Sequence, residues 1–120
     1  MNPPRRKIVL DANEAARENA GPDTPAEEVD QAARKVIESA GYGEYFTHRT
    51  GHGLGLEGHE EPYIRDGNSM LLTPGMTFTI EPGIYLPGRG GVRIEDNVVV
   101  TEDGLLSFSD MPRELKILGG

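Results

Sequence analysis

The spacing of apolar residues changes once along this chain, near Gly41, and this change limits the folds open to it. From Val29 to Ala40, apolar side chains recur at the i, i+3, i+4 and i+7 positions of a helix. Beyond Gly41 that period is lost, and residues 76–87 alternate between apolar and polar side chains, as a half-buried strand does. Helices followed by strands predict an α+β domain.

Two helices are predicted before the change. Residues 8–20, IVLDANEAARENA, are rich in helix-forming Ala, Glu, Arg and Leu, and a Gly-Pro pair follows them. Residues 24–40 begin with a capping box, in which Thr24 caps the helix and Glu27 lies three residues later. Residues 1–6 precede the first helix and are expected to be disordered.

The later apolar segments predict an antiparallel sheet. Residues 76–87, MTFTIEPGIYLP, predict a strand, and residues 91–109 predict a strand, a turn at residues 102–104 and a returning strand. Residues 113–118, RELKIL, predict a short strand or an ordered end. We therefore expect a single α+β domain over residues 1–120, with two helices followed by an antiparallel sheet.

Composition and charge exclude several kinds of partner. The chain carries 20 acidic and 12 basic side chains, a net charge of −8, which argues against binding to nucleic acid or to an anionic membrane and suits a protein that binds cations. It has no cysteine, so disulfides and thiolate metal sites are ruled out. No window approaches the roughly 18 apolar residues of a membrane span. A cytoplasmic protein is expected.

The segment THRTGHGLGLEGHEEPY, residues 47–63, has a composition that stability alone does not explain. It holds three histidines, four glycines and three glutamates. Glycine is costly inside regular structure, whereas imidazoles beside carboxylates are typical of proton or metal chemistry. His52 stands between glycines, where the backbone can approach a bound group closely, and His59 follows seven residues later. His48 lies in the same segment and is assigned no role.

Two glutamates occupy strands that are otherwise apolar. Glu81 and Glu95 are predicted on the face opposite the core residues, and Pro82-Gly83 interrupts the first strand just after Glu81. A lone glutamate there is ordinarily a solvated surface residue. Arg93, however, is predicted on the same face as Glu95, where it can orient a carboxylate. One imidazole with several carboxylates suits Mn²⁺, Co²⁺ or Fe²⁺ better than structural zinc.

Three stretches of the chain together resemble one enzyme family. TGHGLGLEGHEEPYI, GMTFTIEPGIYLPG and GVRIEDNVVVTEDG are similar in order and spacing to the three C-terminal motifs of Xaa-Pro dipeptidases (prolidases) and Xaa-Pro aminopeptidases. The resemblance runs from about residue 7 to the end. It implies the pita-bread fold and a metal-dependent exopeptidase. Such an enzyme hydrolyses the peptide bond before proline through a dinuclear centre held by two Asp, one His and two Glu.

The resemblance assigns roles to individual residues. It implies that His52, Glu81 and Glu95 are metal ligands, with Glu95 bridging the two ions. It also implies catalytic roles for His59, Glu81 and Arg93. His59 would contact the substrate and stabilise developing negative charge, Glu81 would also move a proton, and Arg93 would support the site. The metal is expected to be Mn²⁺ or Co²⁺, and the substrate a proline-containing dipeptide or peptide.

The two aspartate ligands of that family have no counterpart here. Asp11, Asp23 and Asp30 lie in predicted helices or in the turn between them, and the family's catalytic domain is about twice this size. The chain therefore resembles the second half of that domain alone. On its own it should hold at most one ion, weakly, because the charges of two close cations need more carboxylates to balance them. An exposed strand edge also predicts self-association or a partner that supplies the missing half.

Two other functions stay open at this point. The same fold occurs in non-catalytic modules that bind peptides or proteins, and in metal-free hydrolases of the creatinase type. The absent aspartates favour the first, whereas the retained His52, Glu81 and Glu95 favour the metallopeptidase. The sequence also leaves open whether the chain is a natural short protein, a split-gene product or a fragment.

Overall fold

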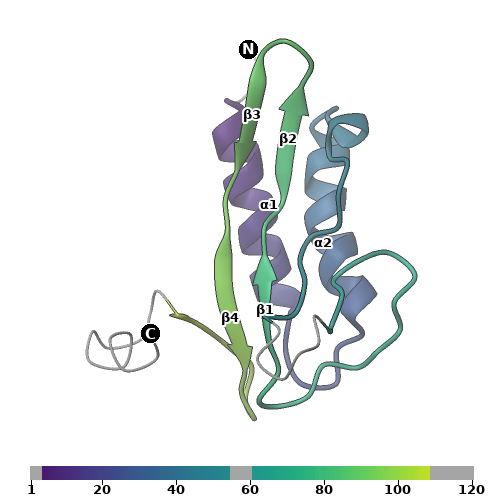
Figure 1. The fold of residues 1–120 in the computed structure, drawn as a ribbon, viewed down its shortest axis with the longest axis vertical. Coiled ribbons are helices and arrows are strands. Elements are labelled where there is room, and N and C mark those ends of the chain that lie inside the picture. Colours follow the sequence, from purple (N-terminus) through teal and green to yellow (C-terminus); the bar gives the residue numbers. More distant parts are fainter. Residues whose placement is uncertain (1–3, 55–60, 109–120) are drawn as a thin grey trace.

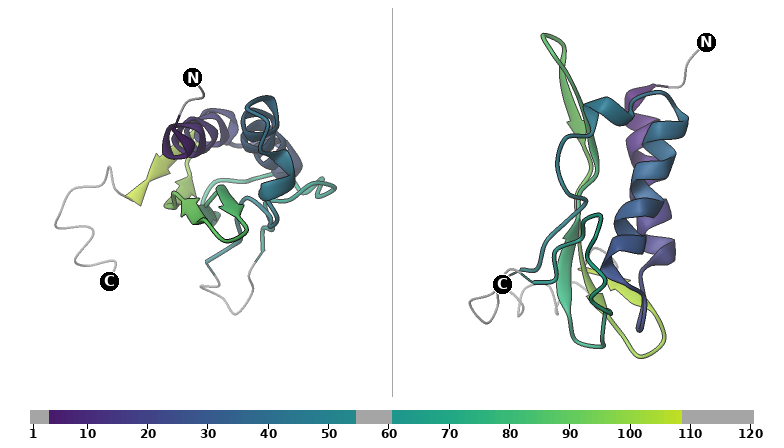
Figure 2. Two further views of the ribbon diagram at one scale, coloured as in Figure 1. Left: turned by 90° about the horizontal axis from the view of Figure 1, so that it is seen from above. Right: turned by 90° about the vertical axis from the view of Figure 1, so that its right-hand side faces the viewer.

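The computed structural model, which describes residues 4–54 and 61–108, has two layers. Helices α1 (Arg5–Asn19) and α2 (Ala26–Ser39) lie side by side and cover one face of a long, twisted antiparallel ribbon of strands (Figures 1 and 2). A short 3₁₀ helix, η1 (Gly43–Tyr45), follows α2. The predicted order of two helices followed by antiparallel strands is confirmed.

Helix α1 begins earlier than the sequence predicts. Arg5 and Arg6, which were expected to be disordered, form its first residues, while residues 1–3 lie outside the described part of the chain. The carbonyl of Pro4 accepts the first helical hydrogen bonds, and Ile8 is buried against the core. Burial of an apolar side chain so close to the end of the helix favours ordering of the residues before it.

Helix α2 is not capped by the predicted box. Its N-cap residue is Pro25, and no side chain, including that of Thr24, bonds to its first turn. The first two helical N–H groups donate instead to carbonyl oxygens far along the chain, Ala26 to Met70 and Glu27 to Asn68, both at 2.8 Å. The prediction was wrong because a tertiary contact satisfied the donors that a local cap would have used.

Five short strands replace the two long stretches that the alternation predicts. They are β1 (Thr77–Ile80), β2 (Gly83–Leu86), β3 (Gly90–Arg93), β4 (Asp96–Val100) and β5 (Leu105–Ser107). All pair antiparallel, in a sheet of order β1-β4-β5 and a separate β2-β3 ribbon. The turn between β4 and β5 is closed by a bond from the Thr101 N–H to the Gly104 carbonyl, which confirms the turn predicted at residues 102–104.

Both long stretches break at the same level of the ribbon. Regular pairing ends at Ile80 opposite Asp96 and resumes at Gly83 opposite Arg93. Pro82 lies inside the break and has no N–H to give to a ladder, so the interruption predicted there is confirmed. The two residues skipped on one strand are 81 and 82, and on the other 94 and 95. Each predicted site carboxylate therefore lies at an interruption of regular pairing.

The core between helices and strands is almost entirely aliphatic. Its largest fully buried apolar side chains are Phe78, Ile37, Ile64, Leu72, Ile80 and Ile84. The predicted inward side of residues 76–87 is confirmed at Phe78 and Ile80. The tail at residues 113–118 lies outside the described residues. Neither described helix combines the length and apolarity needed to cross a bilayer.

Candidate metal centre

The backbone around His52 is held tightly against β1. The His52 carbonyl accepts the N–H of Thr79 at 2.8 Å, and the His52 N–H donates to the Thr79 hydroxyl at 3.1 Å. Gly51 makes this approach possible, because a Cβ atom at that position would lie 1.7 Å from the Thr79 carbonyl oxygen. Only glycine fits there, and the histidine is fixed as a consequence.

The ring of His52 faces Glu81. Its Nδ1 lies 2.8 Å from the Gly53 carbonyl, which can only accept, so Nδ1 carries a proton. In the neutral imidazole, Nε2 then has the free lone pair, and it lies 3.5 Å from Oε2 of Glu81. The His52 side chain is 32% exposed and that of Glu81 15%, so this pair lies at the floor of an accessible site.

Glu81 and Glu95 leave the ribbon where its pairing is interrupted. The Glu81 N–H donates to the Thr50 carbonyl at 2.6 Å, so this carboxylate is tied to the segment that carries His52. Glu95 is exposed, as is Arg93. Within residues 4–54 and 61–108, no group of three or more His, Asp and Glu side chains could hold a metal ion. Among the three ligands that the resemblance implies, the contact present in the described residues is that between His52 and Glu81, and the place of Glu95 in the site stays a prediction.

The pair that does meet fits a divalent metal. Two ligand atoms each about 2.1 Å from one small ion stand roughly 3.0 to 3.5 Å apart, and Nε2 of His52 and Oε2 of Glu81 are 3.5 Å apart. An imidazole with a carboxylate is a donor set that Mn²⁺, Co²⁺, Fe²⁺ and Zn²⁺ all accept. The described residues thus offer two ligands and not a complete coordination shell.

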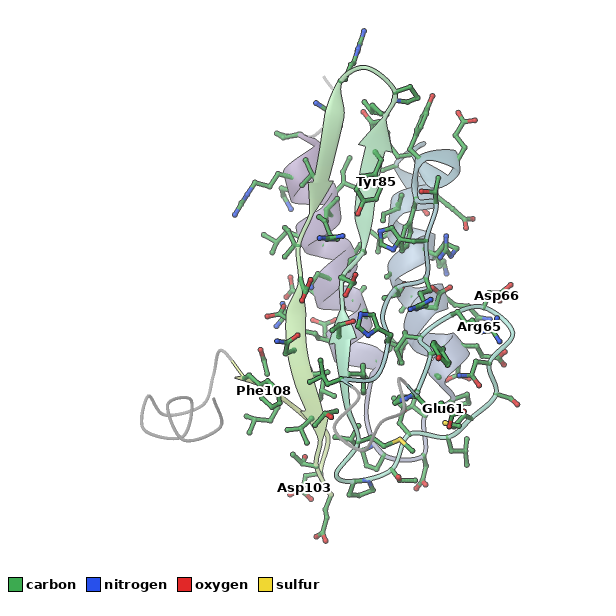
Figure 3. All side chains as sticks on the ribbon, in the orientation of Figure 1. Glu61, Arg65, Asp66, Tyr85, Asp103 and Phe108 are labelled. Atoms are coloured by element: carbon green, nitrogen blue, oxygen red, sulfur yellow. The ribbon has the colours of Figure 1, made fainter. Side chains whose placement is uncertain are left out.

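An open cleft of about 730 Å³ surrounds this pair. Its lining residues are Arg34, Thr47, His48, Arg49, His52, Arg65, Asp66, Glu81 and Arg93. Arg65 and Asp66 come from the loop at the right-hand edge of the molecule, well away from the ribbon (Figure 3). Four arginines against two carboxylates make the cleft locally basic in a chain of net charge −8, and such a cleft attracts anionic groups.

A second histidine in the cleft has both ring nitrogens occupied. Nδ1 of His48 lies 2.6 Å from the Arg49 carbonyl and Nε2 lies 2.8 Å from the Tyr85 hydroxyl. The Tyr85 side chain covers Gly83 and Gly91: a Cβ atom at Gly83 would lie 2.6 Å from its hydroxyl oxygen, and one at Gly91 would lie 2.5 Å from its ring. His48 was assigned no role from the sequence, and Tyr85 was not among the predicted site residues. Tyr85 could have been found from its position opposite Gly91, but this pairing follows from the strand register and cannot be read from the sequence alone.

Helix α2 anchors the loop that carries both histidines. Asp30 is fully buried and accepts hydrogen bonds from Arg34 and from the N–H and hydroxyl of Thr50. Arg34 also donates to the carbonyls of Phe46 and His48 and stacks over the Phe46 ring at 4.1 Å. This buried ion pair therefore links the helix to residues 46–50 and, through Thr50, to the backbone of the site.

A comparison with protein families decides where the chain belongs. The model of metallopeptidase family M24 matches residues 4–102, most of the chain. The chain belongs to metallopeptidase family M24. The match covers both helices and every segment that contributes to the cleft.

Individual M24 relatives are similar over the same region. The probable dipeptidase PepE of Mycobacterium tuberculosis is 59% identical over 107 residues, which is 89% of this chain and 28% of the relative. The Xaa-Pro dipeptidase of Pyrococcus furiosus is 50% identical over 109 residues, 91% of this chain and 31% of the relative. The chain thus spans about a third or less of the length of these relatives.

Solved M24 structures confirm the fold. The prolidase of Pyrococcus horikoshii superposes with a TM-score of 0.84 at 48% identity, covering 92% of this chain and 32% of that one. The PepE dipeptidase of Mycobacterium ulcerans gives 0.84 at 55% identity, over 90% of this chain and 29% of that one. The two helices and the antiparallel strands are therefore one part of the pita-bread fold of these M24 enzymes.

The structure does not describe one predicted site residue, and it places the three early aspartates away from the strands. His59 lies outside the described residues. Asp11 pairs with Lys7 on the surface of α1, Asp23 lies in the turn between the helices, and Asp30 is a buried residue of α2. None of the three is on a strand, as the sequence predicted.

Proposed function

We propose that this chain is the metal-binding C-terminal part of an Xaa-Pro dipeptidase or aminopeptidase, which hydrolyses the peptide bond before proline. The observation that carries the proposal is the His52–Glu81 pair, with Nε2 and Oε2 3.5 Å apart in a cleft of an M24 chain. The relatives named Xaa-Pro dipeptidase support the substrate class.

In this proposal His52, Glu81 and Glu95 hold Mn²⁺ or Co²⁺ in a dinuclear centre that two aspartates from outside this chain complete. A divalent metal held by these residues would supply Lewis-acid chemistry toward the substrate carbonyl and the attacking water. Glu81 takes and returns the proton of that water, since it lies at the floor of the cleft with its backbone fixed by Thr50. His59 stabilises the negative charge that develops on the carbonyl oxygen.

The basic walls of the cleft suit a short peptide with a free carboxylate. Arg34 is engaged with Asp30, whereas Arg49, Arg65 and Arg93 line the cleft and are exposed. A guanidinium binds a carboxylate through two parallel hydrogen bonds, which fixes both position and orientation. Arg93 is the nearest of the three in sequence to Glu95, and it is proposed to support that carboxylate.

The proposal includes a partner that completes the site. The β2-β3 ribbon pairs with no other described strand, so a strand from another chain could add to it. A two-stranded ribbon is only marginally stable by itself. A separate first half of the catalytic domain, or a second copy of this chain, would cover such an edge. The proposed location is the cytoplasm. A chain without cysteine has no disulfide bonds that the reducing cytoplasm would break.

Complementation tests the enzymatic part of the proposal. The chain is mixed with the separately produced first half of an M24 relative, Mn²⁺ and an Xaa-Pro dipeptide, and release of proline is followed. Hydrolysis is expected only with all components present, and Glu81→Gln should lower it by about 100-fold or more. Glu102→Gln, an exposed residue in the β4-β5 turn, is the matched control. Absence of hydrolysis with several different first halves would leave the chain without this activity.

A peptide-binding module without catalysis is the second candidate. It is favoured by one observation, that the described residues include no group of three metal ligands. The arginine-lined cleft could still bind an acidic peptide end. Peptide binding that persists unchanged in EDTA, with no hydrolysis of the Xaa-Pro dipeptide after complementation, would support this reading over the metallopeptidase.

A further inference from the structure

Asn13 is a fully buried polar residue that the proposed chemistry does not use. It lies on the face of α1 that packs against the strands, among apolar neighbours such as Val9 and Ala16. Burying a primary amide costs free energy unless each of its polar atoms finds a partner. The partners of its hydrogen bonds therefore indicate which parts of the fold Asn13 holds together.

The amide of Asn13 joins two strands to the helix. Nδ2 donates to the carbonyl of Ile80 at 3.3 Å and to the carbonyl of Ile94 at 3.2 Å. Oδ1 accepts from Nε of Arg17 at 2.7 Å. Only one orientation of the amide satisfies this set, because the carbonyls must face the NH₂ group and the guanidinium must face the oxygen.

The two carbonyls belong to the residues directly before the site carboxylates. Ile80 precedes Glu81 and Ile94 precedes Glu95, at the level where pairing between the strands is interrupted. An interruption leaves backbone groups without ladder partners, and buried backbone groups need replacements. One Asn13 side chain supplies a donor to each strand and so fixes the distance between the two breaks.

We propose that Asn13 is a positioning residue for the metal centre, which sets the spacing of the Glu81 and Glu95 backbones from the far side of the ribbon. The inference rests on the proposed function of those carboxylates as metal ligands. A side chain with two N–H donors on one planar nitrogen is required, so neither a hydroxyl, with one donor, nor an ionised carboxylate, with none, can replace it. Arg17 orients the amide and also lies 3.6 Å from Asp96, at the start of β4.

Two measurements on the full chain test this proposal. The first is Mn²⁺ affinity, from the loss of the free Mn²⁺ electron paramagnetic resonance signal. The second, without metal, is hydrogen exchange at the Glu81 and Ile94 amides, which donate to the carbonyls of Thr50 and Pro82. The variants are Asn13→Leu, which keeps the volume and loses both donors, and Asn13→Gln, which keeps the amide. Asn19→Leu is the matched control, because the Asn19 side chain donates within α1, to the Ala15 carbonyl, and bonds to neither strand among the residues that the structure describes.

For Asn13→Leu, we expect Mn²⁺ binding about 10-fold weaker, the size typical when a group that orients a metal ligand is removed. Exchange should be faster at Glu81 and Ile94, with circular dichroism showing the helices intact. Asn13→Gln should recover most of both properties, and Asn19→Leu should match the wild type. A folded Asn13→Leu chain with unchanged exchange or unchanged Mn²⁺ affinity would overturn the proposal.

The role of Asn13 and the proposed metal binding can fail independently, because hydrogen exchange is measured without metal. If the wild-type chain binds no Mn²⁺, the proposed function loses its support, and the exchange data alone then decide the role of Asn13. Faster exchange at Glu81 and Ile94 in Asn13→Leu, recovered in Asn13→Gln, would still support positioning of the two breaks. Unchanged exchange would overturn it.

Discussion

The space beside Gly51 is too small for a methyl group, and this single position determines where His52 lies. The Cα of Gly51 packs against the Thr79 carbonyl, and the next residue exchanges two hydrogen bonds with Thr79. A side chain at Gly51 must displace backbone, which is far less able to give way than the end of a flexible side chain.

Gly51→Ala is therefore expected to lower the free energy of unfolding by about 3 kcal/mol, at the upper end of what overpacking costs. Urea denaturation followed by circular dichroism measures this. Gly104→Ala is the control, because a Cβ there meets nothing within 4 Å, and its effect should stay within about 0.5 kcal/mol. Equal stabilities for the two variants would show that the segment around His52 is not tightly packed.

Individual residues also mark the limit of prediction from sequence. The glycines around His52 predicted a close approach of the backbone to a bound group, which stays untested, whereas Gly51 in the structure lies against the Thr79 carbonyl; Glu81 was correctly placed at a strand interruption. Asn13 and Asp30 carried no local signal, because their partners lie far along the chain, at Ile80, Ile94 and Thr50. A polar residue on the buried face of a helix shows its purpose only when the fold brings those partners to it.

At the scale of elements, α2 and the loop after it form one unit through the Asp30–Arg34 pair. The Asp30 side chain is 0% exposed and that of Arg34 26%, whereas the Lys7–Asp11 pair on α1 is 64% and 45% exposed. Both are four-residue helical pairs, so they differ mainly in burial and in further partners. Only the buried pair also holds Thr50 and the carbonyls of residues 46 and 48.

Asp30→Ala should lower the free energy of unfolding by about 3 to 5 kcal/mol, because it leaves the Arg34 charge and the Thr50 donors without their acceptor. Asp11→Ala should cost less than about 1 kcal/mol, as for other exposed pairs. Thermal and urea unfolding of both variants provide the comparison. A loss of unfolding free energy for Asp30→Ala as small as that for Asp11→Ala would contradict the view that α2 fixes residues 46–50.

Element boundaries were harder to predict than element types. The apolar period of α2 and the alternation in residues 76–80 predicted a helix and a strand correctly. The predicted capping box at Thr24 was wrong because the first N–H groups of the helix donate to the carbonyls of residues 68 and 70 instead. The second break, at Ile94-Glu95, contains no proline or glycine and so could not be predicted locally. It lies opposite the first break, because the two strands are paired on either side of it.

At the scale of the whole molecule, the chain matches one part of a larger fold. Its relatives are about three times as long, and the described residues hold two ligands in contact rather than a full set. The β2-β3 ribbon, which pairs with no other described strand, and the exposed Leu71 and Leu106 are surfaces that a larger fold could cover. The sequence motifs predicted the family, because the three motifs keep their order and spacing within the residues present.

We expect the chain alone to self-associate, or to form a stable complex with a first half from an M24 relative. Size-exclusion chromatography with light scattering gives the mass directly. A dimer or larger species, or a one-to-one complex after mixing, agrees with the expectation. A monomer that stays monomeric over a wide concentration range and ignores the first half would show that its edges need no partner.

Metal binding by the isolated chain tests the central claim most directly. Isothermal titration with Mn²⁺ should show one weak site per chain, lost in both His52→Ala and Glu81→Gln, because each removes one of the two ligands in contact. His48→Ala should keep the site, since both ring nitrogens of His48 are already bonded within the protein. Mn²⁺ binding that is unaffected by His52→Ala and Glu81→Gln, or absent from the wild type, would contradict the assignment of this cleft as a metal centre.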